Sequence, residues 1–349
     1  MKKIVVGIVA LLFIIIGAFF TLFTLETTAV SRDTTPIEFE IKKGETYLTI
    51  ASRLKEDNLI KSELFYKIFI KLTNPSKIEA GKYELSESMS VSDIVKKFMK
   101  GNIYNAETVT FTVPEGKHLE EVATIVSKQT NYTEKELIDG WNDTKFIDDV
   151  IEKYWFVTDS VKMDGIRYAL EGYLYPDTYE IYVNASIEDI AYKMLDKMDK
   201  VLTEYKSDIE NSEYSVHELL TMASIIEHEA ILDEDRKIIA SVFYNRLESN
   251  MKLQSCATIG YATNEWKLTY SSTDLKVDSP YNTYYYSGLP VGPGNMPSVK
   301  SIEAALYPEE TDYLYFLANV CDNNDKKTYF SKTYDEHVEK KNKYLTCVN

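Results

Sequence analysis

The sequence predicts a mixed α+β protein with an N-terminal transmembrane helix, a small module of strands and helices, and a larger domain. Three observations predict this class. An uncharged apolar segment opens the chain, strand-like alternation and helical spacing mix in the next segment, and helical patterns interrupted by short strands fill the rest. The 349 residues are 44% hydrophobic and 27% charged, which is typical of a globular protein with room for two or three domains.

The N-terminal segment predicts a membrane anchor. Residues 4–25 carry no charge and follow Lys2 and Lys3. About 20 apolar residues span a bilayer as a helix, whereas a secretory signal has a shorter apolar core and a small-residue cleavage site. The stretch "TLETTAVSR" offers only a weak cleavage site, so a retained anchor is favoured over a cleaved signal. The lysines place the N-terminus in the cytoplasm. We therefore expect residues 1–30 to form a cytoplasmic tip and an anchor in the cell membrane, and residues 31–36 to link it to an extracellular or periplasmic protein.

Residues 37–103 predict a small strand–helix–helix–strand module. "IEFEIKKG" alternates as a strand does, and "ETYLTIASRLKEDNLI" has helical spacing. "SELFYKIFIKLT" indicates a second helix with Ser62 as its cap, and "AGKYELSES" indicates the second strand. A further helix, "SVSDIVKKFMKGN", is capped by Ser90 or Ser92 and closes at Gly101.

Residues 104–349 predict a mixed α+β domain. "ETVTFTVPEG" indicates a strand and a turn, and "HLEEVATIVSKQT" indicates a helix. Helical patterns then continue to about residue 215, interrupted by the aromatic "LEGYLYPDTYEIY", whose proline indicates a loop or short strand. A long helical region, "SVHELLTMASIIEHEAILDEDRKIIASVFYNRLESNM", precedes the loop "SPYNTYYYSGLPVGPGNMPS". The helices "VKSIEAALYP" and "TYDEHVEKKNKYL" flank two pairing strands, "YLYFLANV" and "TYFSK".

Charge and cysteine content exclude several classes of partner. The net charge of −16 argues against nucleic acid and against an anionic membrane surface, because both attract a basic face. The three cysteines, Cys256, Cys321 and Cys347, are too few and too scattered for a disulfide framework or a zinc site. Cys321 and Cys347 could form one bridge outside the cell, and the sequence does not decide this.

Other catalytic motifs fail on spacing. A zinc protease helix needs His-Glu-x-x-His, but His217 is followed at the required place by Thr221, and His228 by Leu232. The sequence also contains neither a Gly-x-Ser-x-Gly elbow nor a glycine-rich phosphate loop. We therefore expect no metal and no organic cofactor.

Two carboxylates in the stretch "MASIIEHEAI" remain as candidate acids. On a helical wheel, Glu227 and Glu229 both fall within the apolar arc, so the wheel does not choose between them. The small Ala223 and Ala230 beside Glu227 could leave space for a ligand. Apolar surroundings raise the pKa of a carboxyl group in general, and a general acid must carry its proton. The alternative is a buried glutamate that Arg246 or a backbone N–H holds for packing reasons.

Several blocks of the chain together resemble one family. "LEGYLYPDTY", "ASIIEHEA", "ASVFYNRL", "MKLQS", the loop containing "YNTYYYSGLP", "SIEAALYP" and "YLYFLA" match, in order and spacing, the endolytic murein transglycosylases of the YceG-like (MltG) family. The resemblance covers the chain from about residue 37 to the C-terminus, and the small module looks LysM-like. It implies cleavage of MurNAc–GlcNAc linkages within peptidoglycan glycan strands, with 1,6-anhydroMurNAc ends as products. It also suggests work beside peptidoglycan synthases, ending nascent strands.

The resemblance implies a role for Glu227 as the catalytic acid. It also implies substrate-groove or support roles for Glu171, Gln254, Tyr281, Asn282, Thr283 and Tyr284. One departure is "LQSCAT", where many members have "LQSDPT", so that Cys256 and Ala257 replace Asp and Pro. A hydrolase needs paired carboxylates, whereas a transglycosylase uses the 6-hydroxyl of the muramic acid itself, so one glutamate suffices. The alternatives are a muramidase, a peptidoglycan-binding scaffold without catalysis and, weakened by the histidine spacing, an extracellular metalloprotease.

Overall fold

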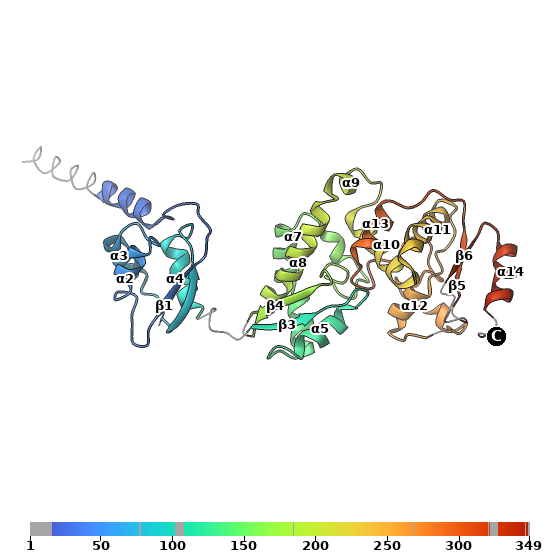
Figure 1. The fold of residues 1–349 in the computed structure, drawn as a ribbon, viewed down its shortest axis with the longest axis horizontal. Coiled ribbons are helices and arrows are strands. Elements are labelled where there is room, and N and C mark those ends of the chain that lie inside the picture. Colours follow the sequence, from blue (N-terminus) through green and yellow to red (C-terminus); the bar gives the residue numbers. More distant parts are fainter. Residues whose placement is uncertain are drawn as a thin grey trace, which may run out of the picture. The chain divides into compact units, whose positions relative to one another are not determined.

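The computed structural model describes residues 16–76, 78–101, 108–183, 185–267, 269–319, 321, 327–345 and 347. The chain divides into two compact units, Met1–Glu107 and Thr108–Asn349 (Figure 1). Their sheets are small and two-stranded, and helices surround them. The expected mixed α+β class is thereby confirmed.

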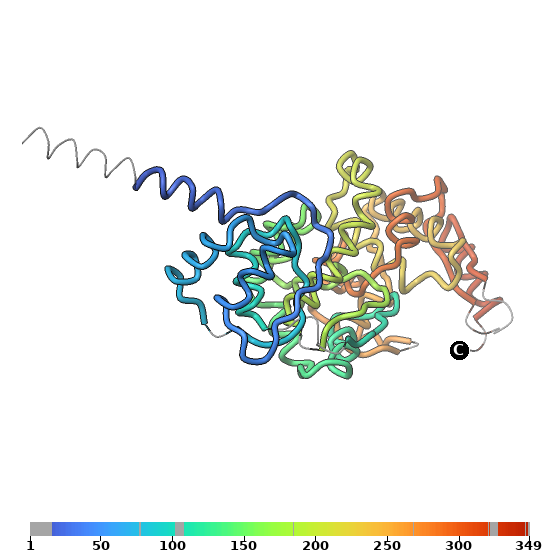
Figure 2. Tube along the Cα trace, turned by 60° about the vertical axis from the view of Figure 1, so that its left-hand side comes forward, coloured from blue at the N-terminus to red at the C-terminus, as the bar shows by residue number. Residues whose placement is uncertain are grey.

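The described chain begins with a helix over residues 16–27, which belongs to the first unit (Figure 2). Phe19 and Phe23 of this helix lie against Phe65, and Phe23 also stacks on Phe69. Among the residues that the structure describes, no helix is both long and apolar enough to cross a membrane. Residues 4–15 of the predicted span lie outside the described residues.

In the first unit, β1 (Ile37–Ile41) pairs antiparallel with β2 (Gly81–Leu85). Helices α2 (Ala51–Glu56), α3 (Glu63–Thr73) and α4 (Val91–Met99) complete the unit. The caps follow local rules, because the Ser62 hydroxyl accepts the N–H of Phe65 and Ser90 forms a capping box with Asp93.

The first helix of this unit is shorter than its sequence pattern predicts. Helical spacing extends from about residue 45 to residue 60, but α2 covers only Ala51–Glu56. The Thr49 hydroxyl donates to the carbonyl oxygen of Thr46 and accepts the Thr46 N–H. Such local side-chain bonds give the backbone an alternative to the helix.

The second unit opens with β3 (Thr108–Thr112), which pairs antiparallel with β4 (Thr178–Tyr182). The aromatic insert thus forms a loop and a short strand, as expected. The helices of this half are α5 (Leu119–Ser127), α6 (Glu134–Trp141), α7 (Thr144–Lys153), α8 (Ile187–Thr203) and α9 (Lys206–Glu210).

The second half of this unit carries the candidate site. Its elements are α10 (Val216–Glu229), α11 (Arg236–Glu248), α12 (Cys256–Thr263), α13 (Val299–Leu306), β5 (Tyr315–Ala318), β6 (Thr328–Ser331) and α14 (Tyr334–Tyr344). Helix α10 is buried along almost its whole length and packs against α13 and α11 (Figure 1). A disulfide joins Cys321 to Cys347, which decides the question that the sequence left open.

The long helical region predicted around residues 215–251 is in fact two helices. Helix α10 ends at Glu229, and a 3₁₀ turn, η2 (Asp233–Asp235), precedes α11. Five consecutive charged residues, 233–237, interrupt the apolar pattern at the break, but the pattern resumes at Ile238, and the region was predicted as one stretch. The break brings Arg236, the first residue of α11, close to the end of α10.

Candidate active site

Glu227 lies in the last turn of α10 and its side chain is only 7% exposed. Its Oε2 accepts the Ser298 backbone N–H at 2.8 Å and the Ser298 hydroxyl at 2.5 Å. Ser298 is also the N-cap of α13. The carboxylate therefore sits at a helix N-terminus, where unpaired N–H groups and the helix dipole stabilise negative charge.

A buried cation completes the surroundings of this carboxylate. Nη2 of Arg236 lies 3.2 Å from Oε1 of Glu227. The same guanidinium donates through Nη1 to the Ser301 hydroxyl at 2.5 Å and through Nε to Asp233 at 3.1 Å. Because three bonds fix the guanidinium, it holds the Glu227 carboxylate in one orientation.

The sequence suggested Arg246 or a backbone N–H as the partner of a buried glutamate. Arg246 exerts its charge on Glu229, and backbone N–H groups bind both Glu227 and Glu229. Arg246 donates to the carbonyl oxygens of Leu253 and Leu314, at 2.6 Å each, and so supports the backbone of two neighbouring segments. The cation beside Glu227 is Arg236, which sequence reasoning missed because the helix break was not predicted. Ser298 was missed as well, since it is 71 residues away from Glu227 in the chain.

The loop after β3 forms another wall beside Glu227. A Cβ atom on Gly116 would lie 3.6 Å from Cγ of Glu227, and this glycine has a φ of +72°. The Gly116 N–H donates to the carbonyl oxygen of Met296, and the Met296 N–H donates to that of Lys117, both at 2.8 Å. The neighbouring Glu115 has a raised pKa because of burial and of the Glu227 charge, which Arg236 partly opposes. A second carboxyl group thus faces the candidate acid.

Glu229 has a different environment at the end of the same helix. It accepts the Ser255 hydroxyl at 2.6 Å and the backbone N–H groups of Cys256 and Ala257, at the start of α12. These contacts agree with the interpretation of Glu229 as a structural residue. The Ala257 contact also gives the departure "LQSCAT" a physical consequence, because the proline found there in many members has no N–H to donate.

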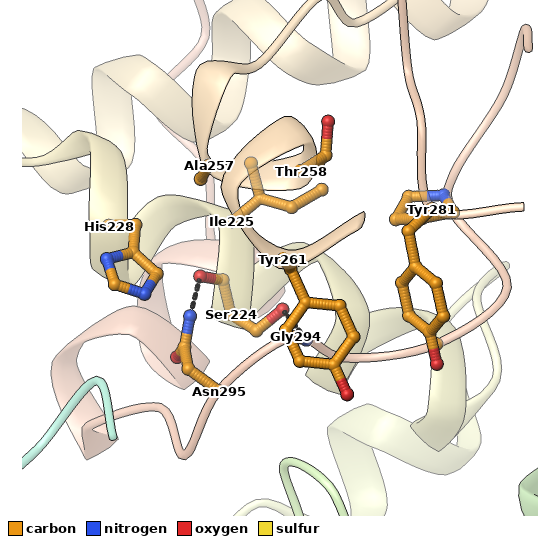
Figure 3. Close-up of a pocket in the computed structure, with 11 residues that line it drawn as sticks. Ser224, Ile225, His228, Ala257, Thr258, Tyr261, Tyr281, Gly294 and Asn295 are labelled. Atoms are coloured by element: carbon orange, nitrogen blue, oxygen red, sulfur yellow. Dashed lines mark hydrogen bonds between the residues drawn. The ribbon is translucent and has the colours of Figure 1, made fainter. Parts of the chain in front are cut away.

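A pocket lies beside α10, on the side of Ser224 and His228 (Figure 3). Its lining residues are Ser224, Ile225, His228, Ala257, Thr258, Tyr261, Tyr281, Pro290, Gly292, Gly294 and Asn295. Asn295 donates to the carbonyl oxygen of Ser224 at 2.7 Å, and the Gly294 N–H donates to the Ser224 hydroxyl at 3.1 Å. The loop before α13 is thereby fastened to α10.

The predicted groove residues have contrasting exposures. Asn282 and Thr283 are buried, and their contacts fit the support role, which is one of the two roles that the resemblance implies. The Asn282 amide donates to two backbone carbonyl oxygens, and the Thr283 hydroxyl accepts the Ser255 N–H. Tyr281 is also buried but lines the pocket. Tyr284 is half-buried, with its hydroxyl 3.3 Å from the Cys256 sulfur.

The two remaining predicted residues, Gln254 and Glu171, differ from each other in exposure. Gln254 is exposed and has a φ of +50°, a left-handed conformation that is uncommon for a residue other than glycine. Glu171 is only 1% exposed, and its carboxylate accepts the Leu119 N–H and the Tyr261 hydroxyl at 3.0 Å each. Burial raises the pKa of Glu171 to about 8. Its contacts give it a support role between α5 and α12, next to the pocket-lining Tyr261.

Within the described parts of the chain, no group of three or more His, Cys, Asp or Glu side chains could hold a metal ion. The arrangement around Glu227 instead orients one carboxylate group, because the Ser298 donors and Arg236 fix both of its oxygens.

Comparison with known proteins gives consistent matches. The profile of the YceG-like family matches residues 39–343. A protein of Bacillus subtilis (strain 168) described as an endolytic murein transglycosylase is 39% identical over 323 residues, which is 92% of this chain and 88% of that protein. A protein of the same description from Streptococcus pneumoniae serotype 2 is 36% identical over 312 residues, which is 85% of this chain but only 56% of that protein.

A solved structure agrees with these matches. The 2.6 Å crystal structure of a YceG-like protein from Listeria monocytogenes superposes with a TM-score of 0.63 at 40% sequence identity. The match covers 88% of this chain and 99% of that chain.

Proposed function

The chain belongs to the YceG-like family, and we propose that it is an endolytic murein transglycosylase, a lyase of peptidoglycan glycan strands. It cleaves MurNAc–GlcNAc linkages within the strand and leaves 1,6-anhydroMurNAc ends. The observation that carries this proposal is the buried carboxylate of Glu227, held between the N-terminus of α13 and Arg236. The relatives from B. subtilis and S. pneumoniae bear the same description.

The proposed mechanism uses Glu227 twice. As general acid, it donates its proton to the glycosidic oxygen while the bond to C1 of MurNAc breaks. As general base, it then takes the proton of the C6 hydroxyl, whose oxygen forms the new bond to C1 and closes the anhydro ring. Ser298 and Arg236 stabilise the carboxylate that forms after the first proton transfer, because their donors already point at it.

We also propose that the protein is a single-pass membrane protein with its N-terminus in the cytoplasm and its catalytic domain outside. The uncharged residues 4–25 support the anchor. The disulfide between Cys321 and Cys347 supports an oxidising location, since such bonds are rare in the cytosol. In this position the enzyme would act beside peptidoglycan synthases and end nascent strands. Fractionation of cells that produce the full chain tests the anchor, and recovery of all the protein in the soluble fraction would contradict it.

Product analysis of Glu227→Gln tests the reaction. Purified glycan strands are incubated with the parent protein and with the variant, and the products are separated and weighed by mass spectrometry. We expect the parent to release anhydro-muropeptides and Glu227→Gln to release none while it melts at the parent's temperature. Glu229→Gln is the matched control, because it alters a neighbouring buried glutamate that binds α12 and should retain turnover.

The other outcomes separate the alternatives. Products with reducing-end MurNAc from the parent would identify a muramidase. Binding of glycan without products, unchanged in Glu227→Gln, would identify a scaffold. Loss of activity in EDTA would revive the metalloenzyme alternative.

A further inference from the structure

Three aromatic rings lie together near Glu227, and the proposed mechanism does not use them. The Trp266 ring stacks on His228 with centroids 4.6 Å apart and on His118 at 4.9 Å, with angles of 29° and 13° between the ring planes. The two imidazoles are themselves 5.7 Å apart. We call His118, His228 and Trp266 the aromatic platform. Trp266 is 46% exposed, whereas Trp141 is completely buried, so one large indole remains open to solvent here.

The aromatic platform is connected to the candidate acid by short pieces of backbone. His228 directly follows Glu227 on α10. Gly116 lies beside Glu227, since a Cβ atom built on it would be 3.6 Å from Cγ of Glu227, and His118, two residues later, contacts Trp266. The loop before α13 makes the same connection, because its Ser298 donates to Glu227 and the carbonyl oxygen of its Gly294 lies 2.7 Å from Nδ1 of His118. The loop after β3 and the loop before α13 therefore each lie next to both Glu227 and the aromatic platform.

The indole is held in place by its neighbours. A Cβ atom at Gly260 would come within 2.6 Å of the Trp266 ring, so the glycine allows the ring to pack directly on α12. Tyr261 of the same helix lies 5.8 Å from His118, ring centroid to centroid, and both His228 and Tyr261 line the pocket. The pKa of His228 is lowered by desolvation and by the nearby His118, which favours its neutral form. The imidazole of His228 therefore adds no positive charge beside the indole.

We propose that Trp266 is a stacking surface for a pyranose ring of the glycan strand, next to the linkage at Glu227. This inference rests on the proposed function and extends it by a specific subsite. A tryptophan offers a broad apolar face together with a polar N–H, which suits the apolar face of a sugar ring. The continuity of the platform with the pocket and with Glu227 selects a glycan as the occupant. His118 and His228 hold the indole in position and are positioning residues.

Intrinsic fluorescence provides a direct test, because the chain has only three tryptophans. The measurement uses the full chain with Glu227→Gln, which binds without turnover, and Trp155→Phe, which removes the half-buried tryptophan signal. Peptide-free glycan strands are added, and quenching of Trp266 by acrylamide is recorded. We expect protection from the quencher to follow the binding curve. Quenching that stays unchanged while glycan binds would overturn the proposal.

The kinetic test uses Trp266→Ala with otherwise native sequence. Loss of the stacking surface should raise KM about tenfold, equivalent to about 1.4 kcal/mol, with a much smaller change in kcat, because the indole binds and does not react. Trp266→Phe should recover part of the loss. Tyr334→Ala, which removes a 63% exposed aromatic ring on α14, is the matched control and should leave KM unchanged. If the parent forms anhydro products and Trp266→Ala has the parent's KM, the subsite is wrong and the function stands. If the parent forms no such products, the proposed function itself fails.

Discussion

Removing the Ser298 hydroxyl tests whether its bond to Glu227 serves catalysis. The hydroxyl donates to Oε2 of Glu227 at 2.5 Å and is also placed to cap α13 through the Ser301 N–H at 3.3 Å. A hydrogen bond to a charged group contributes about 1.5–3 kcal/mol. If the bond is made fully only when the carboxylate has given up its proton, Ser298→Ala lowers kcat by about 10- to 150-fold, at 1.36 kcal/mol per factor of ten.

The same substitution also removes a helix cap, so stability needs a control. Losing a serine N-cap costs about 0.5–2 kcal/mol of stability. Ser186→Ala removes the cap of α8, whose hydroxyl accepts the Asp189 N–H at 3.0 Å, without touching Glu227. Release of anhydro-muropeptides is measured for both variants under conditions where circular dichroism shows them folded. Equal turnover of Ser298→Ala and Ser186→Ala would refute the catalytic role of the hydroxyl.

Three other predictions concern stability. Arg236→Met leaves a buried carboxylate without its cation and should destabilise the protein by about 3–5 kcal/mol in denaturant unfolding, whereas adding Glu227→Gln should recover part of this loss. Reducing the disulfide between Cys321 and Cys347, 26 residues apart, should cost about 3–4 kcal/mol by chain entropy; a double serine variant should unfold at the same midpoint with or without reductant. The raised pKa of Glu171 means that the folded protein keeps this carboxyl protonated at pH values where the unfolded chain has lost the proton. Its contribution to stability is therefore complete below its ordinary pKa of 4.5 and is lost as the pH rises through about 8. The free energy of unfolding should therefore fall by at most about 5 kcal/mol over this range, and Glu171→Gln should flatten the profile; parallel profiles would exclude Glu171 as the cause.

Local patterns predicted much of the fold. Each of the three antiparallel pairs joins strands that alternation or aromatic content had indicated. The caps at Ser62 and Ser90 follow from short-range hydrogen bonding, which depends only on neighbouring residues. The helix break after Glu229 was missed because apolar residues resume on its far side, although the charged run at 233–237 marks it in the sequence.

The site was predictable only in part, because it assembles residues from distant segments. Glu227 was found through its apolar helix and the family blocks. Arg236 and Ser298 contact it only after the chain has turned at η2 and after the loop before α13 has folded back onto α10. The aromatic platform combines residues from α10, from the loop after β3 and from the segment after α12. A weak sequence signal for it existed, since a tryptophan beside polar residues is uncommon outside packed cores.

The stretch "MASIIEHEAI" contains two glutamates, and the structure shows why a helical wheel could not decide which of them is the acid. Each carboxylate accepts a hydrogen bond at the start of another helix, Glu227 from Ser298 and Glu229 from Ser255. Both buried negative charges are therefore stabilised in the same way. The difference lies in what else each one touches. Arg236 fixes Glu227, and the loop at Gly116 lies against it, whereas Glu229 is occupied by the backbone of α12. The contacts beyond α10, and not the apolar arc of α10 itself, therefore favour Glu227 as the acid.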